Sequence, residues 1–196
     1  MIETVILAFI VAKCKKYKLL PIFRQWCIYP IMICVSIYIY LEFIIWHEDY
    51  SLIKYSVYFK AVYLGFFIIL SLKNNQIRTL VYGLPLVWLG YGLNIIAINA
   101  NGGKMPVFPS LTIFTGYIKP NTFINTTTYG DFHVMGGYYT KMIPLCDIWD
   151  IGGFCIVSIG DILIRLFVFL VIYNSIKYIN KRLEGDVALY PSHMKK

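Results

Sequence analysis

The sequence predicts an all-α fold: a polytopic membrane helix bundle with about five transmembrane helices and a folded extracytoplasmic loop between the last two. Composition is the first indication, because 59% of the 196 residues are hydrophobic and only 14% are charged, which is too apolar for a soluble domain. The second is that the apolar residues form long runs. The third is that basic residues flank these runs, as cytoplasmic anchors do.

The first two predicted spans cover residues 1–13 and 26–46. The apolar run of the first, residues 1–12, reaches only roughly 18 Å at about 1.5 Å per residue, so it is short for a bilayer. Its positive charges follow the apolar run instead of preceding it, which indicates a retained helix rather than a cleaved signal peptide. The second span lies between Trp26 and Trp46, and tryptophan favours the membrane–water interface.

The remaining predicted spans cover residues 54–72, 79–98 and 151–176. Gly83, Gly90 and Gly92 in the fourth span favour close packing of helices in lipid. Residues 177–196 form a polar tail. With the basic loops on the cytoplasmic side, the N-terminus lies outside and the C-terminus in the cytoplasm. The whole chain, 1–196, is then one membrane domain.

This topology places residues 99–150 outside the membrane. The segment is rich in aromatic and aliphatic side chains, so we expect a folded cap and not a disordered linker. Within it, residues 107–118 are predicted to contain a short helix and residues 121–129 an extended or turn conformation. Gly102 and Gly103 fit a tight exit from the fourth helix, because glycine accepts positive φ.

Polar residues inside the spans fall at one depth, in the outer half of the membrane. Charges in lipid are costly unless they are paired or hydrated, so this pattern predicts a polar cluster under the cap. Two interpretations stay open, a working site or structural pairs of Asp161 with Arg165 and of Glu42 with Lys60. The residues of this layer are Glu3, Glu42, Lys60, Asn94, Asp161 and Arg165.

The cap adds candidate ligand and acid–base residues. Asp131, His133, Asp147 and Asp150 offer one imidazole and three carboxylates, while Asn101 and Lys104 flank the glycine turn. Their spacing fits no standard metal motif, so we expect neither a metal nor another cofactor. We also expect Cys146 and Cys155 to remain unpaired.

Two family resemblances follow from these residues. Asn101-Gly-Gly-Lys-Met-Pro106, then His133, Thr140, Leu145 and Asp147, then Ser158-Ile-Gly-Asp161, resembles a family of small integral membrane proteins of unknown function found in clostridia and their relatives. That resemblance covers most of the chain and implies a multi-pass protein of a bacterial plasma membrane, without implying an activity.

Asp131-Phe132 and Ile159-Gly-Asp-Ile-Leu-Ile164 are similar to the end of the lipoprotein signal peptidase pattern. The likeness implies a catalytic aspartate at Asp161, near the outer face. The first half of that pattern, a Gly-Asn-x-x-Asp-Arg run, is absent here. A shared-proton mechanism needs a second carboxylate, which Asp147, Asp131 or Glu42 would supply.

Three functions are compatible with these observations. The first is a non-enzymatic membrane protein that binds a partner protein, a lipid headgroup or a small ligand at the polar cluster. The second is an intramembrane aspartyl-type hydrolase that uses Asp161 with Asp147 or Asp131. The third is a small transporter or channel subunit. Expected partners are the bilayer and a membrane protein or a second copy; nucleic acid is excluded, because the basic residues flank apolar runs.

Overall fold

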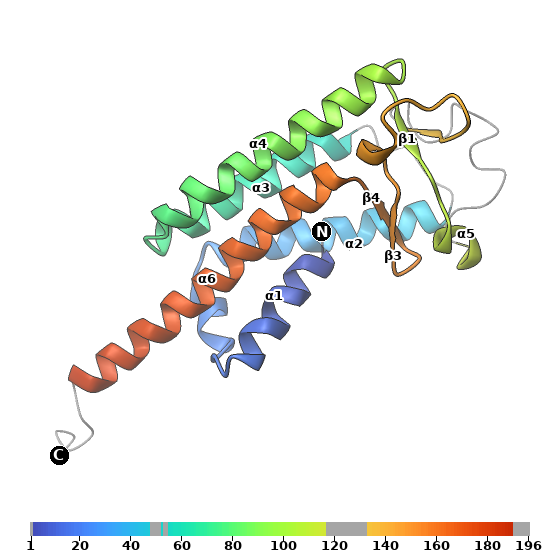
Figure 1. Ribbon diagram of the computed structural model, residues 1–196. Coiled ribbons are helices and arrows are strands. Elements are labelled where there is room, and N and C mark those ends of the chain that lie inside the picture. Colours follow the sequence, from blue (N-terminus) through green and yellow to red (C-terminus); the bar gives the residue numbers. More distant parts are fainter. Residues whose placement is uncertain (1, 48–51, 53–54, 117–132, 190–196) are drawn as a thin grey trace.

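The computed structural model describes residues 2–47, 52, 55–116 and 133–189, and it is mostly helical (Figure 1). The long helices are α1 (Ile2–Cys14), α2 (Ile28–Trp46), α3 (Ser56–Lys73), α4 (Ile77–Ala100) and α6 (Ile159–Leu189). The short helices are η1 (Leu20–Arg24), α5 (Leu111–Phe114) and η3 (Ile143–Leu145). The strands are β1 (Met105–Val107), β2 (His133–Met135), β3 (Trp149–Ile151) and β4 (Cys155–Val157), and they gather at one end of the helices.

Two of the described helices, over Ile77–Ala100 and Ile159–Gly185, are long and apolar enough to cross a membrane. The 24 residues of α4 reach about 36 Å at about 1.5 Å per residue, compared with about 30 Å for a bilayer core. These helices are weak evidence for membrane association. The five predicted spans are not confirmed, since α1 has only 13 residues and the apolar part of α2 is Ile28–Ile44.

The last helix begins later than the predicted span start at residue 151. Trp149–Ile151 and Cys155–Val157 instead form an antiparallel hairpin around Gly152 and Gly153, whose φ angles are +66° and +75°. Side chains other than glycine rarely adopt such angles, so the turn depends on this pair. The helix then starts at Ile159 and continues to Leu189, past the predicted end at residue 176.

Helices α4 and α6 pack closely through small residues. Gly83, Gly90 and Ala97 recur at every seventh position of α4, so they lie on one face, and all three are buried. A Cβ at Gly83 would lie 2.6 Å from the Phe167 ring, and one at Gly90 would meet the backbone of Gly160. The close packing expected for the fourth helix is therefore achieved against α6 at Gly83 and Gly90, whereas a Cβ at Gly92 would meet nothing within 4 Å.

The core continues toward the other end of the bundle, where polar side chains fasten the linker between α1 and α2. Asn180 of α6 accepts a hydrogen bond from the backbone N–H of Lys18 (2.7 Å) and donates one to its carbonyl (2.9 Å). Gln25 and Asn74 exchange two hydrogen bonds, of 2.9 and 3.1 Å. This basic linker is thus held against α3 and α6 by neutral amides.

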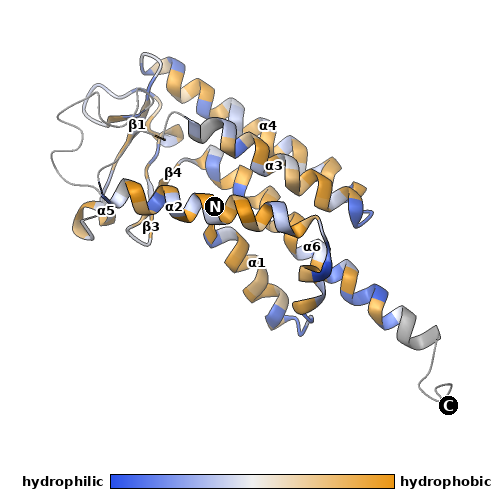
Figure 2. Ribbon diagram, turned by 180° about the vertical axis from the view of Figure 1, so that it is seen from behind, coloured by the Kyte–Doolittle hydropathy of each residue, from blue (hydrophilic) through white to orange (hydrophobic). Residues whose placement is uncertain are grey.

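The helices present apolar outer faces, and hydrophilic segments gather at the end opposite the strands (Figure 2). Trp88 on α4 is 78% exposed and Tyr58 on α3 is 71% exposed. The basic side chains of the opposite end are also exposed; they are Lys13, Lys15, Lys16, Lys18, Arg24, Lys73 and Arg78.

The described part of the cap is built on short strands. Gly102 and Gly103 have φ angles of +71° and +84°, as expected for a tight exit from α4. Strand β1 pairs in parallel with β2, and Val107 also bridges to Asp147. The helix predicted within residues 107–118 is only α5, Leu111–Phe114, after which Gly116 turns at φ +74°. The predicted extended stretch 121–129 lies outside the described residues.

Candidate functional site

The candidate site is built at the start of α6 by Ser158. Its hydroxyl accepts a hydrogen bond from the backbone N–H of Asp161 (3.0 Å) and donates one to the Asn94 side-chain oxygen (2.8 Å). The first contact caps the helix and the second fixes it against α4. Asp161 is therefore held in the first turn of α6, where the helix dipole favours a carboxylate.

An ion pair between α3 and α6 is the centre of the site. Lys60 Nζ donates to Asp161 Oδ1 at 2.6 Å, and Asn94 Nδ2 lies 3.5 Å from the same oxygen. The Lys60 and Asp161 side chains are 25% and 22% exposed. The structure thus brings three predicted residues together from three helices, in a position that remains partly open.

Arg165, one turn further along α6, has different partners from those the sequence suggested. Its guanidinium donates to Glu3 Oε2 (3.2 Å) and to Cys155 Sγ (2.9 Å). The suggested Asp161–Arg165 pair is not formed, because Arg165 reaches α1 and β4 while Asp161 is taken by Lys60. The suggested Glu42–Lys60 pair is likewise replaced by Lys60–Asp161.

Several other predicted site residues lie elsewhere. Asn101 donates to the carbonyls of Ala97 (2.8 Å) and Lys141 (2.9 Å) and accepts from the Lys141 N–H (2.8 Å), so it joins the cap to the end of α4. Glu42 is half-buried on α2, and Lys104 is half-buried after the glycine turn. Asp131 lies outside the described residues.

Asp147 lies in the cap. Its N–H donates to Pro106 O (3.0 Å) and its carbonyl accepts from Phe108 N–H (2.8 Å), so its backbone is fixed to the chain around β1. The side chain is 8% exposed, and its Oδ2 lies 3.8 Å from His133 Nε2, beyond hydrogen-bond distance. Its Oδ1 is buried and has no hydrogen-bond partner within the described part of the chain.

The protonation states of Asp147 and His133 follow from this environment. Burial, and then the charge of Asp161, raise the pKa of Asp147 to about 8, although Lys60 and Arg165 oppose the shift. Burial lowers the pKa of His133, and Lys60 adds to that effect while Asp161 opposes it. At neutral pH the carboxyl is mostly protonated and the imidazole neutral, so the two do not form an ion pair.

Asp150 has a structural role that the sequence did not reveal. Its Oδ2 accepts hydrogen bonds from the N–H and the hydroxyl of Thr112 (2.7 and 2.9 Å) and from those of Ser110 (3.1 and 3.3 Å). Burial alone would raise the pKa of Asp150, but these hydrogen bonds outweigh it and lower the pKa. No local signal in the sequence points to this role, because Ser110 and Thr112 lie 40 and 38 residues before Asp150.

Cys146 and Cys155 are both free, as predicted. Cys146 is buried and donates to the carbonyls of Met142 (3.4 Å) and Lys141 (3.6 Å), whereas Cys155 faces Arg165. Among the residues that the structure describes, no group of three His, Cys, Asp or Glu side chains is placed to hold a metal ion.

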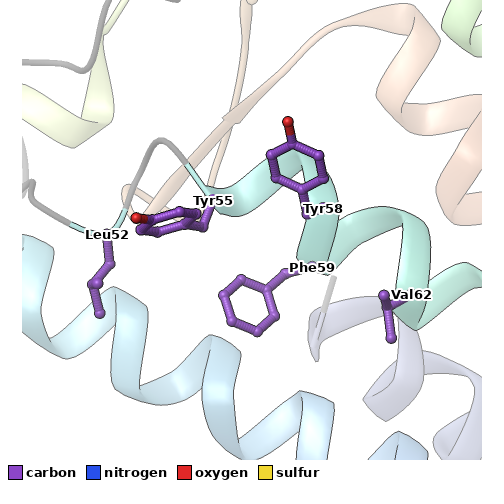
Figure 3. Close-up of a pocket in the computed structure, with 5 residues that line it drawn as sticks. All are labelled: Leu52, Tyr55, Tyr58, Phe59 and Val62. Carbon is purple, nitrogen blue, oxygen red and sulfur yellow. The ribbon is translucent and has the colours of Figure 1, made fainter.

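A separate apolar cavity of about 430 Å³ lies beside the start of α3. Figure 3 shows Phe59 directed toward α2, while Tyr58 points away from it. The lining residues are Leu52, Tyr55, Tyr58, Phe59 and Val62. None of them is charged, so this cavity differs in chemistry from the Lys60–Asp161 site.

Comparison with protein-family models matches residues 19–173 to a family described as "Family of unknown function (DUF5317)". This agrees with the expected resemblance to a family of unknown function. No curated protein and no solved structure matches the chain.

Proposed function

This chain belongs to DUF5317, a family of unknown function, and we propose that it is a multi-pass membrane protein that binds the polar head of a lipid at its outer side. The membrane assignment is supported by the two long apolar helices and by the apolar residues exposed around the bundle. It is also supported by the amide contacts inside, because buried polar groups need partners where water is absent. We place the exposed basic end in the cytoplasm of a bacterial cell and the cap outside.

The ion pair between Lys60 and Asp161 is the observation that carries the binding proposal. A buried pair with no access to solvent would only join helices, but about a quarter of the Lys60 side chain and 22% of Asp161 stay exposed. A zwitterionic headgroup carries one anionic phosphate and one cationic amine. It therefore offers an alternative partner to each member of the pair, through charge-assisted hydrogen bonds.

The position of the pair also favours a headgroup. Asp161 lies at the start of α6, directly after strand β4, and Lys60 lies near the start of α3, so the pair is not at the middle of a span. Charges at such a depth meet the headgroup region, where water and lipid polar groups lower the cost of separating a pair. The apolar exterior of the neighbouring helices provides the surface along which lipid chains lie.

An aspartyl-type hydrolase is a second candidate, which one observation favours. Asp161 is ion-paired with Lys60, whereas Asp147 carries a proton at neutral pH, and a division between an ionised and a protonated carboxyl suits acid–base chemistry. Lys60 and Asn94 nevertheless both approach Asp161 Oδ1, so a nucleophilic water would have to displace existing contacts.

Lipid binding is tested by thermal unfolding of the purified full chain in detergent micelles. Phosphatidylethanolamine, phosphatidylglycerol and phosphatidylcholine are titrated separately into the wild type and a Lys60→Met/Asp161→Asn double variant, which removes both charges together. Lys104→Met removes a cap lysine as the control. A ligand that binds the folded state raises the midpoint.

We expect phosphatidylethanolamine to raise the midpoint of the wild type and of Lys104→Met, and to have a much smaller effect on the double variant. An equal shift in the double variant would overturn the proposed site. A shift caused by phosphatidylglycerol alone would overturn the zwitterionic headgroup, because only the lysine would then be recognised.

A further inference from the structure

Asp147 occupies an unusual place between the cap and the helices. Its backbone is bonded on both sides to the chain around β1, so the carboxyl moves with the cap. The side chain is nevertheless 8% exposed and feels the charges of the helix residues Asp161, Lys60 and Arg165. A change in the charge of Asp147 therefore acts where the cap meets the bundle.

The charges around Asp147 compensate a charge on its carboxyl only in part. Lys60 of α3 is paired with Asp161, and Arg165 of α6 with Glu3 of α1. His133 of β2 is neutral at neutral pH and lies 3.8 Å away, while Cys146, the preceding residue, carries a thiol whose pKa burial and Asp147 raise. No Lys or Arg side chain among the described residues forms an ion pair with Asp147, and its buried Oδ1 has no hydrogen-bond donor.

We propose that Asp147 is a proton-binding residue, and that release of its proton loosens the described part of the cap, residues 101–116 and 133–150, from the helices. This inference builds on the proposed function, because the cap lies next to the Lys60–Asp161 site and its opening would change access to that site. The ligand that Asp147 binds is a single proton. The carboxyl is neutral and tolerated while the cap is closed, and it ionises when the cap opens to water.

The direction of the pH effect follows from the pKa of Asp147. The value in the closed cap is about 8, above the 3.8 of a free Asp, so the closed state binds the proton more tightly than the open one. The protonated carboxyl therefore stabilises the closed cap fully below the pKa of a free Asp. This stabilisation is lost as pH rises through the closed-state pKa of about 8. Between these two pKa values, the population of the open cap rises by up to about tenfold per pH unit.

Cys146 supplies the reporter for this opening. It is buried next to Asp147, so a maleimide reaches its thiol only when the cap opens. The experiment uses the full chain in phosphatidylcholine vesicles, with Cys14, Cys27, Cys34 and Cys155 replaced by alanine. Labelling rates are compared between Asp147 and an Asp147→Asn variant from pH 5 to 9. The ratio of the two rates removes the ordinary effect of pH on the thiol.

We expect this ratio to rise about tenfold per pH unit below about pH 8 and to level off above it. A constant ratio across the range would overturn the proposal. If Asp147→Asn does not fold, infrared titration of the wild type provides the test, and the loss of one protonated carboxyl between pH 6 and 9 is expected. Absence of that loss would overturn it as well. No lipid ligand is needed, so failure here is distinct from failure of the headgroup proposal.

Discussion

Gly90→Ala tests the contact on which the arrangement of α4 and α6 depends. A Cβ at Gly90 would collide with the carbonyl oxygen of Gly160 and lie 3.0 Å from Ile164 Cγ1. The first obstacle is backbone, which cannot turn away as a flexible side chain does. The two helices must therefore move apart, and the Ser158–Asn94 hydrogen bond beside them would be strained.

The expected magnitude comes from comparison with Gly92→Ala on the same helix. Nothing lies within 4 Å of a Cβ at Gly92, so that variant gains only helix propensity, up to about 1 kcal/mol. Both variants share this gain, and it cancels in their difference. The remaining cost of overpacking at Gly90 is about 1–3 kcal/mol, so Gly90→Ala should be less stable than Gly92→Ala by that amount.

Equilibrium unfolding of the purified protein in mixed micelles measures this difference, with helix content followed by circular dichroism. Wild type, Gly90→Ala and Gly92→Ala are compared under identical detergent conditions. Equal free energies of unfolding for the two variants would show that α4 and α6 do not approach at Gly90, and the position of Asn94 beside Asp161 would then lose its support.

Three further predictions concern polar contacts. Ser158→Ala removes the cap of α6 and the bond to Asn94, and should lower the free energy of unfolding by about 0.5–2 kcal/mol in the same titration. Asn180→Leu leaves the Lys18 backbone without its partners, so hydrogen exchange at the Lys18 amide should accelerate; unchanged protection would contradict this contact. Asp150 has a lowered pKa, so its contribution to cap stability is present at neutral pH and is lost as pH falls through its folded-state pKa, below 3.8. Hydrogen exchange at the Thr112 amide measures this loss, and Asp150→Ala should exchange faster than wild type at neutral pH but no faster at pH 2.

Counting residues along the helices predicted that Lys60, Asn94 and Asp161 lie at the same level of the bundle, because the rise of a helix is fixed, and these three side chains do meet. It did not predict which charges pair. Asp161 and Arg165 share a helix face at i, i+4 spacing, yet Arg165 reaches Glu3 on another helix, more than 160 residues away in sequence. Pairing depends on how the helices are rotated about their axes, which one sequence does not specify.

The cap was predicted as a folded unit, but its parts were not. The apolar run from Ile151 has the composition of either a strand or a buried helix, and periodicity does not separate the two in short runs. Gly152-Gly153 and Ser158 were the local signals that a hairpin precedes the helix. The hydrogen bonds of Asp150 to Ser110 and Thr112 connect segments far apart in sequence, so only the fold reveals them.

The accessibility of position 161 is the most direct measurement of the proposed site. In a background without the native cysteines, Asp161→Cys is exposed in intact cells to a membrane-impermeant maleimide, and Ile164→Cys, at a position 1% exposed, serves as the control. We predict that the thiol at 161 is labelled from outside and the thiol at 164 is not. Labelling of 161 only after the membrane is permeabilised, or no labelling at all, would contradict a water-accessible polar site at the outer side of the bundle.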